Sequence, residues 1–443
     1  MIIATAPAVA PGTLLERGHA FFGLVVFLLI CYLIGRVYSK TRGVPWRVVA
    51  WGVGLAFAFG LIVLKVPTLL PAVQDVIQKL LDFTLVGAQL VFGNLATYAG
   101  PPVNDASGHP TGQIANTGAV VAFVVLPTIV FVSMLTAILY RLHVLGWVVN
   151  GLAWVMRRTM RTSGAETLST AANIFVGQTE APLIVRPFLA AATRSELMAI
   201  MVGGFANIAS GVLVVYAGWL KDFVENAGGH LAAACFVSAP VTLVVSKLIL
   251  PETETPATVD SAGRDVEQID ANLIDAATRG TSEGLTLAIN VGAMLLAFTA
   301  LVALLNAVIG YGFLKAGVAD MTMQRLLGYV CAPVAWLCGV PWQECTKVGA
   351  LLGVKTVLNE LLAYRQMADG FIADPNYLSP RAGLLATYAL CGFANIASVG
   401  IQIGGISVLA PERRHELSRL GFIAMLGGAI ASCIGACVIG VLV

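Results

Sequence analysis

Long apolar runs separated by short charged segments dominate the chain. Runs with few or no Asp, Glu, Lys or Arg residues predict membrane-spanning helices at 18–35, 48–64, 117–140, 198–220, 230–250, 284–314, 382–410 and 420–443. A helix needs about 17 to 25 mainly apolar residues to cross the hydrocarbon core, because the core is about 30 Å thick and each residue adds about 1.5 Å to a helix. The pattern therefore predicts an all-α polytopic membrane protein with eight transmembrane helices.

Three kinds of segment depart from this pattern. Residues 75–95 carry Asp75, Lys79 and Asp82 among Leu, Val and Phe, which favours an amphipathic helix lying on the membrane surface. Residues 100–115 are rich in proline and polar side chains and predict an external loop. Two segments, 164–192 and 343–367, are too polar for simple spans, and they predict re-entrant helical hairpins that enter and leave on one side.

Basic residues orient the predicted spans. A group of cations follows the first run, which predicts an external N-terminus and a cytoplasmic first loop. Two further basic groups and the acidic segment 251–283 are then predicted to be cytoplasmic, and both termini external. The first hairpin would enter from the cytoplasm and the second from outside. The basic groups are Arg36, Lys40, Arg42 and Arg47; Arg157, Arg158 and Arg161; and Arg413, Arg414 and Arg419.

The chain contains an internal duplication. The heptapeptide at 204–210, Gly-Phe-Ala-Asn-Ile-Ala-Ser, returns unchanged at 392–398. Upstream, Val-Leu-Gly-Trp at 144–147 matches Leu-Leu-Gly-Tyr at 326–329. Interrupted hydrophobic segments at matching places in two halves are typical of secondary transporters built from inverted repeats. The predicted divisions are N-terminal helices (1–142), a first repeat (143–250), a connector (251–283), a separate helix (284–322) and a second repeat (323–443).

Polar residues within the repeats indicate the kind of ligand. Glu180 and Glu360 can accept hydrogen bonds from hydroxyl groups and would repel an anion. The amides of Gln178 and Asn395 both donate and accept, and Phe393 offers a flat face for a ring. Together they favour a neutral, planar solute rich in hydroxyl groups.

Composition narrows the functional class. The chain is 58% hydrophobic and only 11% charged, against about 25% charged in soluble domains. A net charge of +2 predicts no nucleic-acid partner. Its eight cysteines form no Cys-x-x-Cys motif and its histidines are few, so neither a metal cluster nor an enzyme is expected.

Three motifs in the chain are typical of one known family of proteins. They are Gly-Gln-Thr-Glu-Ala-Pro-Leu at 177–183, Asn-Glu at 359–360 with Ala-Tyr at 363–364, and the second heptapeptide with Gly-Ile-Gln-Ile-Gly-Gly at 400–405. In order and spacing the chain resembles concentrative nucleoside transporters over roughly 20–440. The resemblance implies a homotrimer whose protomers work as elevators, each with a scaffold domain and a transport domain. The eight-span form, without the extra N-terminal spans of animal relatives, predicts a bacterial inner-membrane protein.

The resemblance also implies residue roles. A nucleoside would be bound on its base side by Gln178, Thr179, Glu180, Val212 and Phe393, and on its ribose by Glu360, Asn395 and Ser398. The positions matching a Na⁺ site are Asn173, Val176, Asn207 and Ile208. Asn207 replaces the family's hydroxyl, so either Na⁺ bound through its amide oxygen or protons carried by a buried glutamate could be the coupling ion. No other cofactor is expected.

Simpler interpretations stay open for each residue. Glu180 and Glu360 could form structural ion pairs, and the two asparagines could be interhelical hydrogen-bond partners. Phe393 and Val212 could be packing residues. For the whole protein, the alternatives are an uncoupled facilitator or channel and a dicarboxylate carrier, which would want an exposed Arg rather than two glutamates. A purine or a pyrimidine preference is left open. The cations considered for ion pairs are Arg186, Arg365 and Lys355.

Overall fold

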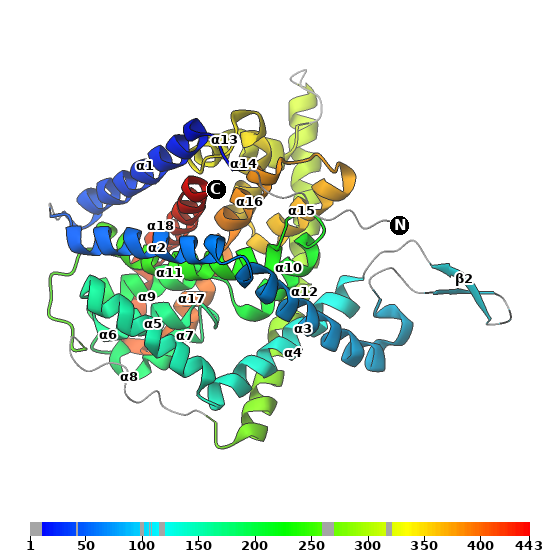
Figure 1. Cartoon of the computed structure of the whole chain (residues 1–443), viewed down its shortest axis with the longest axis horizontal. Helices are drawn as coiled ribbons and strands as arrows, with labels where there is room; N and C mark the ends of the chain where they lie inside the picture. Colours follow the sequence, from blue (N-terminus) through cyan, green and yellow to red (C-terminus); the bar gives the residue numbers. More distant parts are fainter. Residues whose placement is uncertain are drawn as a thin grey trace.

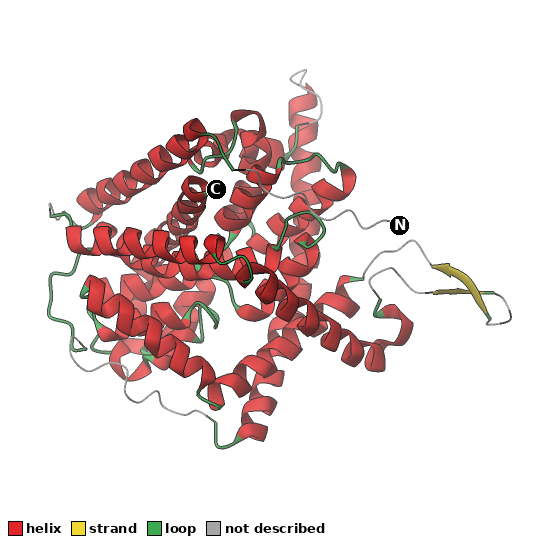
Figure 2. Cartoon of the chain, viewed as in Figure 1, coloured by secondary structure: helices red, strands yellow, loops and turns green. Residues whose placement is uncertain are grey.

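The computed structural model describes residues 11–40, 43–97, 102–105, 107, 109–114, 120–258, 270–315 and 321–443. This part of the chain is helical apart from one small strand pair (Figure 2). Within it, eight helices are long enough and apolar enough to cross a membrane. The predicted all-helical class is therefore confirmed, while the membrane topology stays a prediction.

The N-terminal part is a series of long helices. A capping box, in which Thr13 and Glu16 satisfy each other's backbone N–H groups, begins the first helix. The predicted external loop contains the antiparallel strands, which project from the helical body (Figure 1). Residues 100, 101, 106, 108 and 115 of that loop lie outside the described part. The elements are α1 (Leu14–Tyr38), α2 (Trp46–Lys65), α3 (Leu69–Phe92), η1 (Gly93–Leu95), β1 (Pro102–Asn104), β2 (Pro110–Ile114) and α4 (Val121–Arg141).

The first repeat forms seven helical pieces in which a short hairpin precedes a broken helix. The predicted span 198–220 is interrupted because Asn207 takes an extended backbone conformation, with φ −121° and ψ 165°. Phe175 at the hairpin turn approaches this break, where its carbonyl accepts from the Ser210 N–H at 3.4 Å. The pieces are α5 (Val144–Met160), α6 (Gly164–Ala172), α7 (Ala181–Ile184), α8 (Arg186–Leu189), α9 (Arg194–Ala206), α10 (Ser210–Leu220) and α11 (Ala227–Ile249).

The second repeat repeats this order after a single long helix, α12 (Leu273–Lys315). A hairpin is again followed by a broken helix, so the predicted span 382–410 is not continuous: it is interrupted between Leu390 and Ile396. The pieces are α13 (Met323–Leu337), η2 (Trp342–Glu344), α14 (Cys345–Val357), α15 (Glu360–Ala373), α16 (Pro380–Leu390), α17 (Ile396–Leu409), η3 (Pro411–Arg413) and α18 (Arg414–Leu442).

Two expected boundaries differ in the structure. Residues 273–283, assigned to the connector, are the first three turns of α12. Arg279 of these turns contacts Glu283 at 2.9 Å and Asp270, which precedes the helix, at 2.7 Å. Hydrogen bonding from Arg279 holds the pKa of Asp270 below its usual range. The segment predicted to lie on the membrane surface is α3, which with η1 also satisfies the length and composition of a span. Residues 259–269 of the connector lie outside the described part.

Burial separates an inner body from surrounding helices. In their most apolar windows, the broken helix α9–α10 and α11 are 94% and 89% buried, against 17% for α12 and 33% for α4. The peripheral α12 and α4 pack closely (Figure 1). The contact leaves no room for side chains at two glycines of α12: a Cβ at Gly284 would lie 2.8 Å from the Val130 Cα, and one at Gly280 would lie 2.9 Å from the Ser133 carbonyl oxygen. Glycines four residues apart allow such close helix contact. The repeats thus form the interior, beside a pair of long peripheral helices.

Candidate functional site

The two copies of the heptapeptide meet at the centre of the molecule. The Phe393 N–H donates to the Asn207 carbonyl at 3.3 Å, which joins one helix break to the other. Gly392 has φ +129°, and a Cβ there would lie 2.6 Å from the Phe205 carbonyl oxygen. Only glycine adopts that conformation without strain and allows this approach. The duplicated sequence therefore brings two sets of interrupted backbone together.

Asn395 organises the second break. It is the N-cap of α17, and its Oδ1 accepts from the Ser398 N–H at 2.8 Å. An asparagine at this position satisfies one of the free N–H groups at the start of a helix. Its Nδ2 donates to the Glu360 carboxylate at 2.9 Å. One side chain therefore both begins a helix and holds the predicted ribose-binding glutamate.

Glu360 joins the second hairpin to both breaks. It is the first residue of α15, where Asn359 is the N-cap, and a helix N-terminus favours a negative charge. Its other oxygen accepts from the Tyr216 hydroxyl of α10 at 3.1 Å. Tyr216 stacks on Tyr364 with 4.3 Å between ring centroids, and Val212 lies one turn earlier on α10. Glu360 is 5% exposed, so a hydroxyl-bearing ligand would bind it in a largely dry site.

Gln178 and Thr179 lie at the first hairpin's turn, where Thr179 contacts the second repeat and Gln178 packs against a helix of its own repeat. A Cβ at Gly405 of α17 would lie 2.8 Å from the Thr179 methyl carbon, and one at Gly204 of α9 would lie 2.9 Å from the Gln178 Cβ. Each hairpin turn therefore contacts the broken helix of the opposite repeat: the first touches α17, and the second touches α10. These reciprocal contacts between hairpin turns and broken helices hold the two repeats together.

Two amide oxygens near that contact have no protein partner among the described residues. They are the Oε1 atoms of Gln178 and Gln402, both buried, although Gln402 Nε2 donates to the Met201 carbonyl at 3.0 Å. Leaving a buried acceptor unpaired costs about 1–3 kcal/mol. Such groups are usually satisfied by water or a ligand, so a donor-bearing ligand or solvent molecule is expected between them.

Glu180 lies apart from Gln178 and Thr179. Its carboxylate accepts from the Gly177 N–H at 3.3 Å. It lines a small cavity of about 70 Å³ facing α4 and α12, together with Tyr140, Ser210 and Arg279. The three consecutive residues expected on the base side therefore do not share one surface in this structure.

The residues matching an ion site cluster around the first break. Asn173 ends α6, and its Nδ2 lies 3.2 Å from where a Gly203 Cβ would be. Asn207 Oδ1 accepts from the Ser238 hydroxyl of α11 at 3.0 Å. Hard cations bind oxygen ligands of any kind, and an amide oxygen already in one hydrogen bond keeps a second lone pair. Val176 and Ile208 are buried beside them and offer backbone carbonyls. This donor set suits a small cation.

The ion pairs considered for the two glutamates are not formed in the described part of the chain. Arg365 pairs with Asp369 at 2.9 Å, and Lys355 donates to the Ala389 carbonyl at 2.9 Å. The partners of Glu360 are a tyrosine and an asparagine instead. Among the described residues, the interpretation of Glu180 and Glu360 as members of structural ion pairs is therefore not supported by a cation at either carboxylate.

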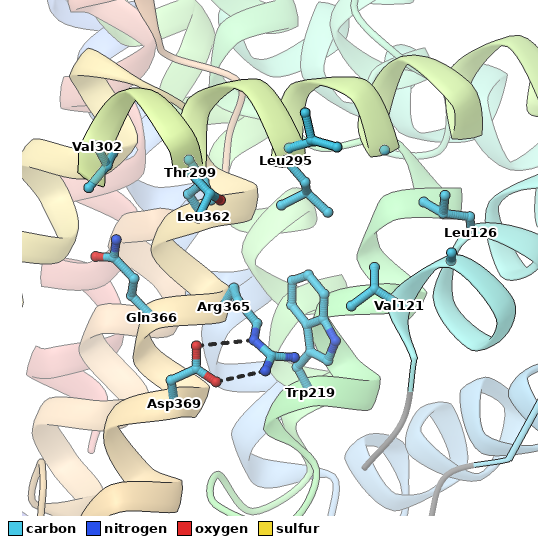
Figure 3. Close-up of a pocket in the computed structure, with 13 residues that line it drawn as sticks. Val121, Leu126, Trp219, Leu295, Thr299, Val302, Leu362, Arg365, Gln366 and Asp369 are labelled. Atoms are coloured by element: carbon cyan, nitrogen blue, oxygen red, sulfur yellow. Dashed lines mark hydrogen bonds and ion pairs between the residues drawn. The ribbon is translucent and has the colours of Figure 1, made fainter. Parts of the chain in front are cut away.

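A larger cavity of about 440 Å³ lies between the peripheral helices and the inner body (Figure 3). Its walls are α4 and α12 on one side and α10 and α15 on the other, and Arg365 lies between Asp369 and Trp219 at its floor. The volume falls in the range of small-molecule sites, about 300–1,000 Å³. Both this cavity and the one at Glu180 lie along the same seam.

Sequence reasoning missed three polar residues of this centre. Tyr216 and Ser238 lie in apolar runs, and only their hydrogen-bonding groups distinguish them there. Gln402 lies in the Gly-Ile-Gln motif but had no expected role. Tyr216 and Glu360 are 144 positions apart, so the contact between them is visible only once the repeats are folded.

Two hairpins, two helices broken at matching positions and buried polar groups at their meeting point are typical of a secondary transporter. Sequence profiles agree: "Na+ dependent nucleoside transporter N-terminus" matches residues 22–95, "Nucleoside recognition" matches 122–223, and "Na+ dependent nucleoside transporter C-terminus" matches 230–440. The chain belongs to the family of Na⁺-dependent, concentrative nucleoside transporters. This is a family of transporters and not of enzymes.

Individual relatives support the assignment. The uncharacterized transporter YutK of Bacillus subtilis is 38% identical over 425 residues, which are 95% of this chain and 98% of that protein. Sodium/nucleoside cotransporter 1 of Mus musculus is 38% identical over 442 residues, 96% of this chain. The chain spans 64% of the length of that mouse protein.

A solved structure shares the fold. CNTnw in an inward-facing substrate-bound state superposes with a TM-score of 0.86 at 35% identity, covering 96% of this chain and 97% of that chain. A variant of CNTnw solved in an outward-facing state gives a TM-score of 0.84. The present chain is thus similar to one protein seen in two access states.

Proposed function

We propose that the protein imports nucleosides into a bacterial cell by symport with a cation. The observation that carries the proposal is the cluster of Glu360, Asn395 and Tyr216, which links the second hairpin to both broken helices. A substrate bound there would contact the second hairpin and both broken helices. Binding energy at such a meeting point can bias a conformational equilibrium, because the ligand would bind one arrangement better than another.

The chemistry of the cluster suits a nucleoside. Glu360 accepts hydrogen bonds and Asn395 both donates and accepts, which matches a pair of ribose hydroxyls with no net charge. Gln178 and Gln402 offer buried amide oxygens that a base amino or imino group could satisfy. Phe393, Val212, Thr179 and Ser398 complete the proposed site, and Glu180 would face the substrate after a movement of the first hairpin.

Sodium is the coupling ion we favour. Asn173 and Asn207 offer amide oxygens beside the first break, and the family is described as Na⁺-dependent. Unwound carbonyls and half-helix C-termini are recurring cation ligands in transporters. Protons are the competing coupling ion, because Asn207 replaces a hydroxyl and is already held by Ser238.

Alternating access would follow an elevator mechanism in a homotrimer. In this proposal the scaffold consists of the N-terminal helices together with α12, and the two repeats carry the substrate past it. The hairpins would be re-entrant, and the protein would lie in the bacterial inner membrane. Two cavities along the seam between α4–α12 and the repeats support the division, because unfilled space weakens packing there. Exposed leucines such as Leu296 and Leu304 on α12 suit lipid or neighbouring protomers.

Uptake of radiolabelled uridine, adenosine and succinate by cells lacking their own carriers tests this proposal. We expect both nucleosides or one of them to accumulate, and succinate not to. Accumulation of succinate instead would favour the dicarboxylate carrier. Equilibration of uridine without accumulation would favour an uncoupled facilitator.

A further inference from the structure

Lys355 is a buried cation that the proposed site does not use. It lies on α14, the first helix of the second hairpin, and is 2% exposed. Its Nζ donates to the Ala389 carbonyl near the end of α16 at 2.9 Å. Burying an ammonium costs several kcal/mol unless the surroundings compensate it. A lysine in this position therefore calls for a specific compensating charge.

The internal duplication makes Lys355 the second-repeat counterpart of Asn173, a residue of the proposed ion site. The Gly-Trp and Gly-Tyr landmarks at 146 and 328 set an offset of 182 for the first part of each repeat, and this offset pairs Asn173 with Lys355. The heptapeptides set an offset of 188 for the broken helices, which pairs Gly203 with Cys391. Asn173 lies against Gly203, and Lys355 reaches Ala389, two residues before Cys391. Each side chain therefore extends from its hairpin to the C-terminal part of the half-helix that precedes the break in the same repeat.

The end of a half-helix attracts positive charge. The last carbonyls of a helix have no intrahelical partner, and together they carry about half a negative charge. In the second repeat the Lys355 ammonium meets such a carbonyl directly. In the first repeat the corresponding contact is made by neutral amides, with Asn207 Nδ2 3.5 Å from the Gly203 carbonyl. One half-helix end therefore receives its cation from the chain, while the other is left for an ion from solution.

We propose that Lys355 is a resident cation of the second repeat, held at the position equivalent to the coupling-ion site of the first. The inference rests on the proposed cation coupling. Its consequence is stoichiometric: the second repeat needs no dissolved ion, so one coupling cation accompanies each nucleoside. Lys355 and Glu360 lie on the two helices of the same hairpin, so the resident cation and the carboxylate proposed to bind ribose belong to one element.

Two variants of Lys355 test the proposal in the purified full-length protein. Lys355→Met removes the charge and supplies no ligand. Lys355→Asn installs the residue that the first repeat carries at the equivalent position. Lys347→Asn is the matched control, because Lys347 is on the same helix and also donates to a carbonyl, that of Tyr377 at 2.7 Å. Uridine affinity is measured by thermal shift and calorimetry across Na⁺ concentrations, and melting without ligand reports folding.

For Lys355→Met we expect uridine affinity to fall about tenfold or more at every Na⁺ concentration, because the C-terminal end of α16 loses the positive charge that stabilises it. For Lys355→Asn we expect affinity to recover at high Na⁺, with the Hill coefficient for Na⁺ rising from about 1 toward 2. The Lys347 variant should behave as wild type.

Wild-type uridine affinity in Lys355→Met would overturn the proposal, and so would a Lys355→Asn variant that does not respond to Na⁺. If Lys355→Met does not fold, the Asn variant alone decides. Wild-type binding of uridine that is independent of Na⁺ would instead contradict sodium coupling. The resident cation would then be judged by whether Lys355→Asn gains a Na⁺ dependence that the wild type lacks.

Discussion

The two repeats build the same geometry with different chemistry. Each places a hairpin against a helix that breaks within an identical heptapeptide, yet the first break is lined by the neutral Asn173, Asn207 and Ser238. The second is flanked by Lys355 and Glu360. Duplication thus supplies two equivalent backbone frames, each made of a hairpin and the broken helix of the same repeat. The residues around each break decide what the frame can bind. A cation suits the first frame and hydroxyl groups suit the second.

The bases of the two hairpins also differ, but in the opposite sense. At the start of α6, Glu166 forms a buried ion pair with Lys247 of α11 at 2.6 Å, and Lys247 also donates to Ser195 at 2.7 Å. At the start of α14, Glu344 instead accepts from the N–H and hydroxyl of Ser379, at 2.6 and 2.7 Å. A buried pair anchors the first hairpin, whereas a helix-cap contact anchors the second.

The largest expected effect is on Glu360. Glu360→Gln replaces an acceptor of two hydrogen bonds by an amide of nearly the same shape, and we expect nucleoside uptake to fall about 100-fold, the loss typical of a charged hydrogen-bonding group in a buried site. Surface levels should stay normal. Glu412→Gln, on the exposed η3, is the matched control. Wild-type uptake by the Glu360 variant would remove it from the site.

Breaking the anchor of the first hairpin should reduce stability more than activity. Glu166→Gln leaves the buried Lys247 with only the more distant carboxylate of Glu252, at 3.5 Å, and breaking a buried pair costs about 3–5 kcal/mol in comparable cases. Thermal unfolding in detergent measures the change. Replacing both partners, Glu166→Gln with Lys247→Met, should be milder than either single change, because no uncompensated charge remains. Additive losses would mean that the pair contributes through packing alone.

Changing the first frame should alter the ion requirement. We expect Asn173→Ala to raise the Na⁺ concentration for half-maximal uptake about tenfold, the cost of losing one good ligand, with nucleoside affinity at saturating Na⁺ nearly unchanged. Asn306→Ala, which removes a hydrogen bond to the Met323 N–H on the peripheral side, serves as control. An unchanged Na⁺ dependence would exclude Asn173 as a ligand.

The smallest effect is expected at the cavity of Figure 3. Arg365 and Asp369 form an i, i+4 pair that is 39% and 50% exposed, and such pairs contribute about 0.3–0.5 kcal/mol. Asp369→Asn should therefore change the melting temperature by about 1 °C or less, with uptake unaltered. A large loss of uptake would instead give this cavity a role in the transport cycle.

Much of the helical organisation could be predicted from the sequence. Capping boxes at Thr13, Ser163 and Thr193 mark helix starts, and the repeated heptapeptide indicates two equivalent breaks. Hydropathy alone does not detect the break inside 382–410, since a broken helix in a protein interior remains apolar. Hydropathy also does not detect the start of α12, where Arg279 pairs with Glu283 and with Asp270 just before the helix.

Candidate residues for the site could be named from the sequence, but their arrangement in space could not. The structure brings Glu360 to Asn395, whereas Glu180 lies toward α12, and binding by either stays a prediction. The contacts of Glu360 with Tyr216 and of Thr179 with Gly405 join segments far apart in the chain, and a single sequence carries no signal for such pairs. Lys355 looked like a possible ion-pair partner, and only its distance to Ala389 shows where its charge lies.

Uridine uptake into proteoliposomes tests the central claim most directly. The purified protein is reconstituted, and an inward Na⁺ gradient or an inward proton gradient is imposed separately. The account predicts accumulation driven by Na⁺ alone, which would support an ion at Asn173 and Asn207. Accumulation driven only by protons would contradict sodium coupling and shift it to a glutamate, and equilibration without accumulation under either gradient would contradict symport itself.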